Sequence, residues 1–164
     1  SGKSRHAEGM LPADAPVCYV ATARVDPDDD EWNARIDTHR ARRPRRWETV
    51  ETTDVAGIIR AGEDPLLLVD DLATWLSVVL DDAGAWDADA LPPVVFRQVV
   101  ELVEAVAGSN SRVVLVSAEV GLGVVPGTRA GRLFRDELGA LNTALAAVCD
   151  EVLLLVAGLP LRLK

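Results

Sequence analysis

The stretch Leu66-Leu67-Leu68-Val69-Asp70-Asp71 places four consecutive apolar residues directly before two acids. An apolar run this short, without polar alternation, is typical of a strand that is buried on both faces, as the strands of parallel sheets are. We therefore expect Leu66 to Val69 to form such a strand. Three other apolar runs are expected to be strands for the same reason: Val17 to Ala21, Val113 to Val116 and Val152 to Val156.

Longer amphipathic segments lie between these runs and predict helices. They are Arg5 to Leu11, Glu31 to Ala41, Asp54 to Ala61, Leu72 to Leu80, Pro92 to Ala107, Thr128 to Leu138 and Asn142 to Val148. Alternating strands and helices favour an α/β fold, with an open, mostly parallel sheet and helices on both faces. Ligands of such sheets bind outside the carboxyl ends of the strands. The length of 164 residues is typical of one domain, so we expect residues 1–164 to form a single domain.

The charge balance excludes some classes of partner. There are 26 acidic and 17 basic residues, a net charge of -9, which opposes binding to a phosphate backbone or to an anionic membrane. The longest apolar runs are far below the ~20 residues that span a bilayer. Cys18 and Cys149 lie in apolar stretches without a C-x-x-C pair, which indicates buried thiols in a reducing compartment. We expect a cytoplasmic protein with neither nucleic acid nor membrane as partner.

Ser1-Gly2-Lys3-Ser4 matches the second half of a phosphate-binding loop, G-x-x-x-x-G-K-[ST]. In such a loop the backbone N–H groups cradle phosphates, the Lys pairs with the outer phosphates, and the hydroxyl holds Mg²⁺. A flexible, solvated start of the chain is the alternative. A phosphate loop follows a strand and opens a helix, so the loop interpretation requires a strand of roughly ten residues ahead of Ser1.

The segment from Arg35 to Trp47 contains six arginines within twelve residues of an acidic chain. The guanidinium fork fits phosphate oxygens, so this cluster favours a polyphosphate ligand. The segment also contains His39, whose neutral imidazole can attack phosphorus. The alternative is a surface histidine beside solvated arginines, and the residues alone leave both interpretations open.

Acids follow two of the expected strands. Asp70 and Asp71 occupy the place where phosphate-loop proteins carry the acid that holds Mg²⁺, directly or through water. One of the two can instead cap the following helix. Glu119 comes shortly after the apolar run that ends at Val116. Together with Lys3, these acids predict a site for a nucleotide with Mg²⁺.

A set of short motifs extends almost from end to end of the chain in a fixed order. They are Ser1-Gly2-Lys3-Ser4-Arg5, Tyr19-Val20-Ala21-Thr22-Ala23, Arg35-Ile36 with His39-Arg40, Arg43-Pro44 ahead of Trp47, Leu68-Val69-Asp70, Glu119 to Pro126, Arg132, Phe134-Arg135-Asp136, Gly139, Asn142, Asp150-Glu151-Val152 and Gly158-Leu159-Pro160-Leu161. This ordered set resembles the bifunctional adenosylcobinamide kinase/adenosylcobinamide-phosphate guanylyltransferase family of cobalamin biosynthesis.

The resemblance implies a P-loop NTPase-like, three-layer α/β fold with a mostly parallel sheet whose first strand precedes Ser1. It also implies two activities, with GTP and ATP as substrates. Adenosylcobinamide is phosphorylated first, and GMP from GTP is then transferred to adenosylcobinamide phosphate. The family carries this GMP on a histidine of the R-I-x-x-H-R stretch, which maps to His39. Lys3 would act with it in catalysis, and Ser4 and Asp70 would hold Mg²⁺. A homotrimer is implied as well.

The motifs and the resemblance together predict one set of nucleotide-binding residues: Ser1, Gly2, Lys3, Ser4, Arg40, Arg43, Asp70 and Glu119. The chain departs from the family pattern at three positions, with Asp71 for the common Cys, Ala118 for Asn and Thr143 for Gln. These differences bear on substrate contacts more than on the class of reaction. The alternatives are a P-loop kinase or NTPase of other small molecules without guanylyl transfer, and a degenerate nucleotide-binding module.

Overall fold

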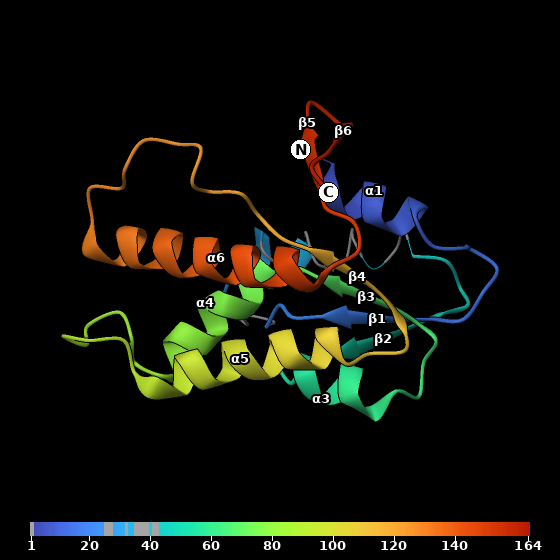
Figure 1. Cartoon of the computed structure of the whole chain (residues 1–164), viewed down its shortest axis with the longest axis horizontal. Coiled ribbons are helices and arrows are strands. Elements are labelled where there is room, and N and C mark those ends of the chain that lie inside the picture. Colours follow the sequence, from blue (N-terminus) through green and yellow to red (C-terminus); the bar gives the residue numbers. More distant parts are fainter. Residues whose placement is uncertain (1, 25–27, 32, 35–39, 41–42) are drawn as a thin grey trace.

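A four-stranded parallel sheet lies at the centre of the protein (Figure 1). The computed structural model describes residues 2–24, 28–31, 33–34, 40 and 43–164. Within them the strand order is β2-β1-β3-β4. The strands are β1 (Val17–Ala21), β2 (Trp47–Glu51), β3 (Leu66–Asp70) and β4 (Arg112–Val116). Because the strands are parallel, their carboxyl ends all lie at one edge of the sheet.

Helices cover both faces of this sheet (Figure 1). Helix α1 (Lys3–Gly9) packs on one face, mainly against β4 and β3. The helices on the other face are α3 (Val55–Ala61), α4 (Leu72–Asp82), α5 (Pro93–Ala107) and α6 (Arg129–Val148). The three-layer α/β fold expected from the sequence is therefore confirmed.

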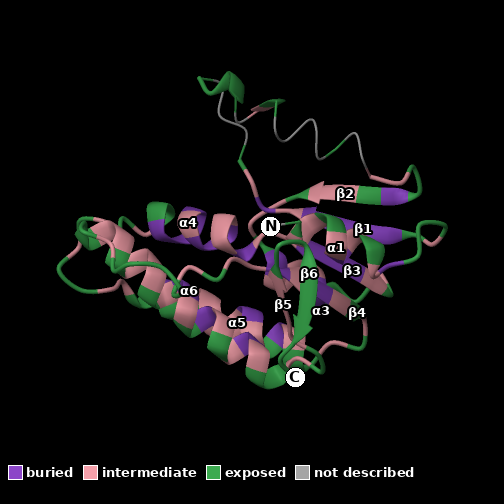
Figure 2. Ribbon diagram, turned by 90° about the horizontal axis from the view of Figure 1, so that it is seen from above, coloured by how far each residue is buried: buried purple, intermediate pink, exposed green. Residues whose placement is uncertain are grey.

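Strands β1 and β3 are largely buried, as their apolar runs predict (Figure 2). In β1, Cys18 and Val20 belong to the core shared with α3 to α6, whereas Val17 and Tyr19 belong to the smaller core under α1. Leu68 in β3 is fully buried under α1 as well. This alternation follows from the period of two in a strand, which sends successive side chains to opposite faces.

Strand β2 was not among the expected strands. Its sequence, Trp47-Glu48-Thr49-Val50-Glu51, contains two acids and lacks the continuous apolar run that marks the other three. Among the described strands it pairs with β1 alone, from Val17 opposite Trp47 to Ala21 opposite Glu51. An edge strand with a half-exposed surface tolerates such polar residues, which is why a search for buried runs misses it.

Helix α6 is a single helix of 20 residues where the sequence predicted two, Thr128 to Leu138 and Asn142 to Val148. The Thr128 side chain caps it by accepting a hydrogen bond from Gly131 N. Leu138, Leu141 and Leu145 are buried at helical spacing, so one continuous apolar face carries the helix through Gly139. Its opposite face is polar, and no helix in the described part of the chain is long and apolar enough to cross a membrane.

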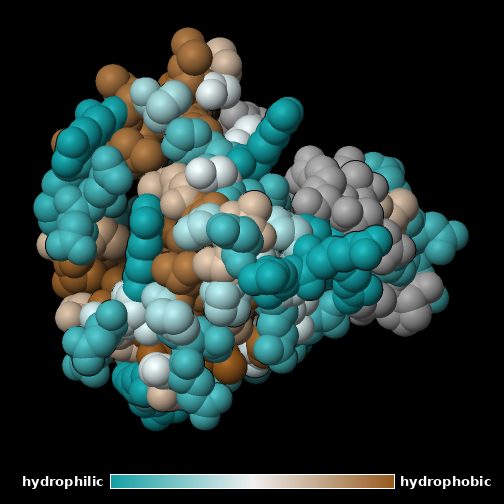
Figure 3. All heavy atoms as spheres, turned by 90° about the vertical axis from the view of Figure 1, so that its right-hand side faces the viewer, coloured by the Kyte–Doolittle hydropathy of each residue, from teal (hydrophilic) through white to brown (hydrophobic). Residues whose placement is uncertain are grey.

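The expected strand at Val152 to Val156 does not join the parallel sheet. Strand β5 (Leu153–Val156) pairs antiparallel with β6 (Leu159–Arg162), through a turn in which Ala157 and Gly158 have positive φ. The hairpin is half-buried at most, so the prediction of a fully buried strand was wrong here. Its exposed apolar residues gather at the top of the molecule in Figure 3. They are Val156, Leu159, Leu161 and Leu163.

The expected helix from Glu31 to Ala41 falls largely outside the described residues. The same holds for His39, and for Ser1 at the start of the phosphate-loop motif. The predictions for these positions therefore stay predictions.

Replacing Leu68 by Ala tests the assignment of β3 to the core. Leu68 is 0% exposed between two layers, so Leu68→Ala is expected to lower the free energy of unfolding by about 2–5 kcal/mol. Leu122→Ala is the matched control, because Leu122 is 78% exposed and its loss is expected to cost no more than about 0.5 kcal/mol. Urea unfolding of both variants gives the comparison. Equal losses would contradict the burial of β3.

Candidate functional site

The carboxylate of Asp70 is the meeting point of three elements at the carboxyl edge of the sheet. Asp70 is the last residue of β3. Ser4, in the first turn of α1, donates a hydrogen bond from its Oγ to Asp70 Oδ1 at 3.0 Å. Tyr19 of β1 donates its hydroxyl to Asp70 Oδ2. Each carboxylate oxygen thus has a hydroxyl partner, and the two residues that were predicted to hold Mg²⁺ lie in contact.

Gly2 brings the chain into α1 at this edge. Its φ of +85° lies in the left-handed region, which residues with a side chain rarely adopt. The Gly2 carbonyl accepts a hydrogen bond from His6 N at 2.9 Å, which fixes the first turn of α1. Lys3 and Ser4 follow at once, so the described part of the motif opens a helix, as a phosphate loop does.

Tyr19 and Arg43 form a stack beside Asp70. The Tyr19 side chain is 1% exposed, and Arg43 Cζ lies 3.6 Å from the centroid of its ring. Arg43 Nη1 donates to Thr49 Oγ1 of β2 at 2.9 Å. Burial, together with the negative charge of Asp70, raises the pKa of Tyr19, while Arg43 opposes this shift. The phenol therefore stays protonated and serves as a donor to Asp70.

Sequence reasoning did not assign a role to Tyr19. The available signal was a phenol within an apolar run, Val17-Cys18-Tyr19-Val20-Ala21. A buried tyrosine hydroxyl usually has a hydrogen-bond partner, and a strand that ends near a functional edge points to a partner in the site.

Asp71 has a different task from Asp70. Its side chain accepts a hydrogen bond from Thr74 N at 2.6 Å and caps the N-terminus of α4. Of the two alternatives that the sequence left open, the helix cap is confirmed for Asp71, and the role of Asp70 in holding Mg²⁺ stays a prediction.

The side chains of Glu119 and Arg40 are both exposed. Glu119 is in the loop after β4, where its Oε1 accepts a hydrogen bond from Gly121 N at 2.9 Å. Arg40 forms an ion pair with Glu51, the last residue of β2. Glu119 follows the end of β4 and Arg40 contacts the end of β2, and their contact with nucleotide stays a prediction.

The oxygen atoms of Ser4 and Asp70 suit a phosphate-bound Mg²⁺. Among the described residues, no group of three or more His, Cys, Asp or Glu is placed to hold a metal. Mg²⁺ commonly takes only one or two protein oxygens and completes its octahedron with water and substrate phosphates. The Ser4 hydroxyl and the Asp70 carboxylate, whose oxygens lie 3.0 Å apart, fit that pattern of few protein ligands.

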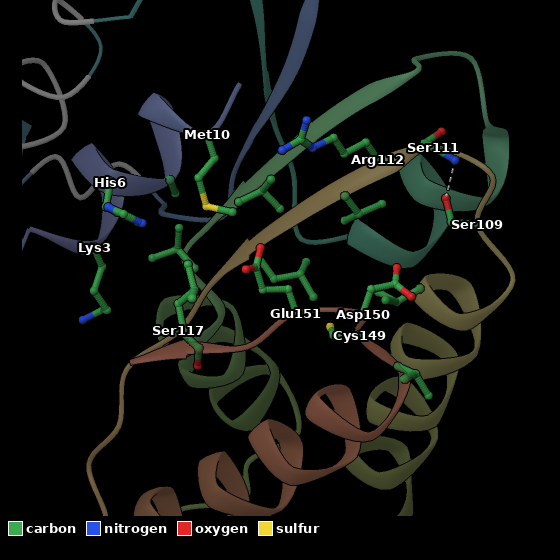
Figure 4. Close-up of a pocket in the computed structure, with 18 of the residues that line it drawn as sticks. Lys3, His6, Met10, Ser109, Ser111, Arg112, Ser117, Cys149, Asp150 and Glu151 are labelled. Atoms are coloured by element: carbon green, nitrogen blue, oxygen red, sulfur yellow. Dashed lines mark hydrogen bonds between the residues drawn. The ribbon is translucent and has the colours of Figure 1, made fainter. Parts of the chain in front are cut away.

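A groove of about 360 Å³ lies between α1, β4 and β5 (Figure 4). Among the described strands, β4 pairs only with β3 and β5 pairs only with β6, so a strand edge faces the groove on each side. Lys3 and Ser117 lie at one end of the groove, and Ser109 and Arg112 lie toward the other (Figure 4). The groove is therefore open to an extended segment that ends beside Lys3.

A comparison with known families decides the assignment. The profile of the family described as cobinamide kinase / cobinamide phosphate guanyltransferase matches residues 1–163. The chain belongs to this family.

Curated relatives agree with the family. The bifunctional adenosylcobalamin biosynthesis protein CobU of Escherichia coli is 38% identical over 173 residues, covering 100% of this chain and 94% of the relative. The protein of the same name from Salmonella typhimurium is 37% identical over 174 residues, with the same coverage. The bifunctional adenosylcobalamin biosynthesis protein CobP of Pseudomonas aeruginosa is 40% identical over 170 residues, covering 100% of this chain and 92% of the relative.

Family membership makes the chain a bifunctional enzyme, a cobinamide kinase and cobinamide phosphate guanylyltransferase that uses nucleoside triphosphates. The resemblance drawn from the ordered motifs is thereby confirmed. The kinase and guanylyltransferase need a site for phosphates. Ser4 contacts Asp70 and Arg43 stacks on Tyr19 at one edge of the sheet, and the contact of these residues with phosphates stays a prediction.

Substitution of Asp71 tests whether this residue acts as the cap of α4, a role that Asp70 does not have. Asp71→Ala removes the acceptor for Thr74 N and is expected to lower the free energy of unfolding by about 1 kcal/mol. Asp71→Asn keeps a capping oxygen and is expected to cost much less. Thermal or urea unfolding measures both. An Asn variant as unstable as the Ala variant would show that the cap is not what Asp71 contributes.

Proposed function

We propose that the enzyme phosphorylates the aminopropanol hydroxyl of adenosylcobinamide with ATP or GTP, and then transfers GMP from GTP to the new phosphate. The products of the second reaction are adenosylcobinamide-GDP and pyrophosphate. The observation that carries the proposal is the contact of Ser4 with Asp70, because it joins the hydroxyl of a phosphate-loop motif to a strand-end acid in a member of this family.

In the kinase reaction, the chain's own groups bind and orient the triphosphate. Lys3 places a positive charge beside the outer phosphates, and the backbone N–H groups around Gly2 point toward the phosphate oxygens. Mg²⁺, held through Ser4 and Asp70, supplies charge neutralisation on the phosphates when it is bound. The substrate hydroxyl then attacks the γ-phosphorus and releases its proton to solvent, the bond from the γ-phosphorus to the β-phosphate oxygen breaks, and a nucleoside diphosphate leaves.

In the guanylyl transfer, the nucleophile is His39. Its neutral imidazole nitrogen attacks the α-phosphorus of GTP, the bond to the β-phosphate oxygen breaks, pyrophosphate leaves, and the second ring nitrogen releases its proton. Arg40 and Arg43 hold phosphate oxygens as charge develops on them. An oxygen of adenosylcobinamide phosphate then attacks the same phosphorus and breaks the P–N bond, which regenerates His39.

The groove between β4 and β5 supports a further part of the proposal. A strand ahead of a phosphate loop would run parallel to β4, fill this groove and end beside Lys3. Five residues, the length of β4, span about 17 Å in extended form. Such a strand would join β4 to the hairpin, whose turn lies against Gly2: a Cβ built on Gly2 would be 3.9 Å from Gly158 Cα.

Assembly as a homotrimer in the cytoplasm completes the proposal and rests on the family resemblance.

An N-terminal extension tests the strand. The extension carries five β-branched residues, then Gly and three further residues, so that the loop motif is complete at Ser1. It is expected to raise the affinity for GTP with Mg²⁺ by roughly tenfold or more, measured by calorimetry, because the completed loop adds backbone donors to the phosphates.

The control extension has Pro in place of the middle strand residue. Proline cannot donate to a ladder and is excluded from central strands, so this version is expected to bind no better than the 164-residue chain. Equal affinity of both extensions would contradict a strand in the groove.

Radioactive labelling tests His39. The extended enzyme is incubated with Mg²⁺ and GTP labelled at the α-phosphorus, and protein-bound label is expected in the wild type but not in His39→Ala. The bond should be labile in acid and stable in base, as a phosphoramidate is. His6→Gln is the matched control, because His6 is the only other histidine of the chain and lies in α1 near Lys3.

Three outcomes are informative. Label that disappears only in His39→Ala supports the guanylyl-histidine step. Label that disappears only in His6→Gln would make His6 the nucleophile and contradict the assignment to His39. An unlabelled wild type that still binds GTP contradicts covalent guanylyl transfer and favours a kinase or NTPase without it.

A further inference from the structure

Tyr19 contacts the two charged parts of the proposed site at once. Its hydroxyl donates to Asp70 Oδ2, and the face of its ring lies 3.6 Å from Arg43 Cζ. The side chain is 1% exposed in the centre of β1, which is itself the neighbour of β3 in the sheet. The rigid, buried ring of Tyr19 therefore links the carboxylate of Asp70, at the end of β3, to the guanidinium of Arg43, which lies ahead of β2 in the chain.

The hydroxyl fixes the orientation of the Asp70 carboxylate. With Oδ2 bound to the phenol, rotation of the carboxylate group would break a hydrogen bond to a charged acceptor, one of the stronger kinds in proteins. Oδ1 is thereby directed to Ser4, whose Oγ lies 3.0 Å away. Partners that orient a metal-binding carboxylate in this manner influence metal affinity without touching the metal.

The ring fixes the position of Arg43. A guanidinium stacked on an aromatic face within 6 Å of its centroid is held by a cation–π interaction. The second restraint is the 2.9 Å hydrogen bond from Arg43 Nη1 to Thr49 Oγ1. Its Nε is buried and has no hydrogen-bond partner in the described part of the chain. The side chain is therefore held mainly by the ring and by Thr49, at the edge where Asp70 ends β3.

We propose that Tyr19 is a positioning residue that couples Mg²⁺ binding to nucleotide binding, its hydroxyl acting through Asp70 and its ring acting through Arg43. This inference rests on the proposed nucleotide–Mg²⁺ site and deepens it. Because the two contacts use different parts of one side chain, they separate in two substitutions. Tyr19→Phe removes the hydroxyl and keeps the ring, and Tyr19→Leu removes both.

The experiment measures the affinity for GTP across a range of Mg²⁺ concentrations and in EDTA, by calorimetry. It uses the 164-residue chain and, in parallel, the extended chain. For Tyr19→Phe, the Mg²⁺ concentration that gives half-maximal enhancement of GTP binding is expected to rise roughly tenfold or more, whereas affinity in EDTA stays within about twofold. Tyr19→Leu is expected to weaken GTP binding in EDTA as well, because Arg43 loses its support.

Trp47→Phe is the matched control. The centroids of the Trp47 and Tyr19 rings lie 6.3 Å apart in the same small core. The Trp47 Nε1 is buried with no hydrogen-bond partner in the described part of the chain. This variant disturbs the packing around Tyr19 but touches neither Asp70 nor Arg43 through a hydrogen bond. It is expected to leave the Mg²⁺ dependence unchanged, and thermal unfolding reports how far each variant is destabilised.

The steady-state kinetics add a second readout. The kinase activity of Tyr19→Phe is expected to recover at saturating Mg²⁺, since the carboxylate is misplaced and not lost. A purely structural defect would persist at any Mg²⁺ concentration. An unchanged Mg²⁺ dependence in Tyr19→Phe, or an equal shift in Trp47→Phe, overturns the role of Tyr19 while the proposed site stands. A wild type whose GTP binding ignores Mg²⁺ overturns the proposed site itself.

Discussion

The hydrogen bonds that converge on Asp70 set the geometry of this protein's functional edge. One comes from the first turn of α1 and the other from β1, so the acid at the end of β3 ties a helix on one face to the neighbouring strand. Both donors are neutral hydroxyls, and hydrogen bonds to a charged acceptor are stronger than those between neutral groups. The start of α1 cannot shift without losing its contact with the sheet at this point.

The parallel arrangement explains why so many polar groups meet there. Carboxyl ends of parallel strands share an edge, and the residues that follow β1, β3 and β4 are brought together without a direct sequence relation. Adjacent residues nevertheless serve separate purposes. Asp70 lies at the shared edge, whereas Asp71 accepts a hydrogen bond from Thr74 N and caps α4.

The parts of the fold that depend on local pattern could be predicted, and the parts that depend on distant partners could not. The run before Asp70 indicated a buried strand because it is apolar without interruption. Nothing local to Tyr19 reveals its partner, which lies 51 residues away in sequence. The same limit applies to Leu153–Val156. Nothing within this apolar run indicates that it pairs antiparallel with β6 and does not join the parallel sheet. Trp47–Glu51 was missed because an edge strand needs only one buried face. His39 lies outside the described residues, so the prediction of its role rests on sequence alone.

The β5–β6 hairpin has a consequence for behaviour in solution. Leu159 and Leu161 of the hairpin and Leu163 just after it are exposed apolar side chains. Exposed apolar patches promote contact between protein molecules. The net charge of -9 acts against such contact through mutual repulsion, which salt screens. Colloidal stability of this chain is therefore governed by one corner of the molecule and by ionic strength.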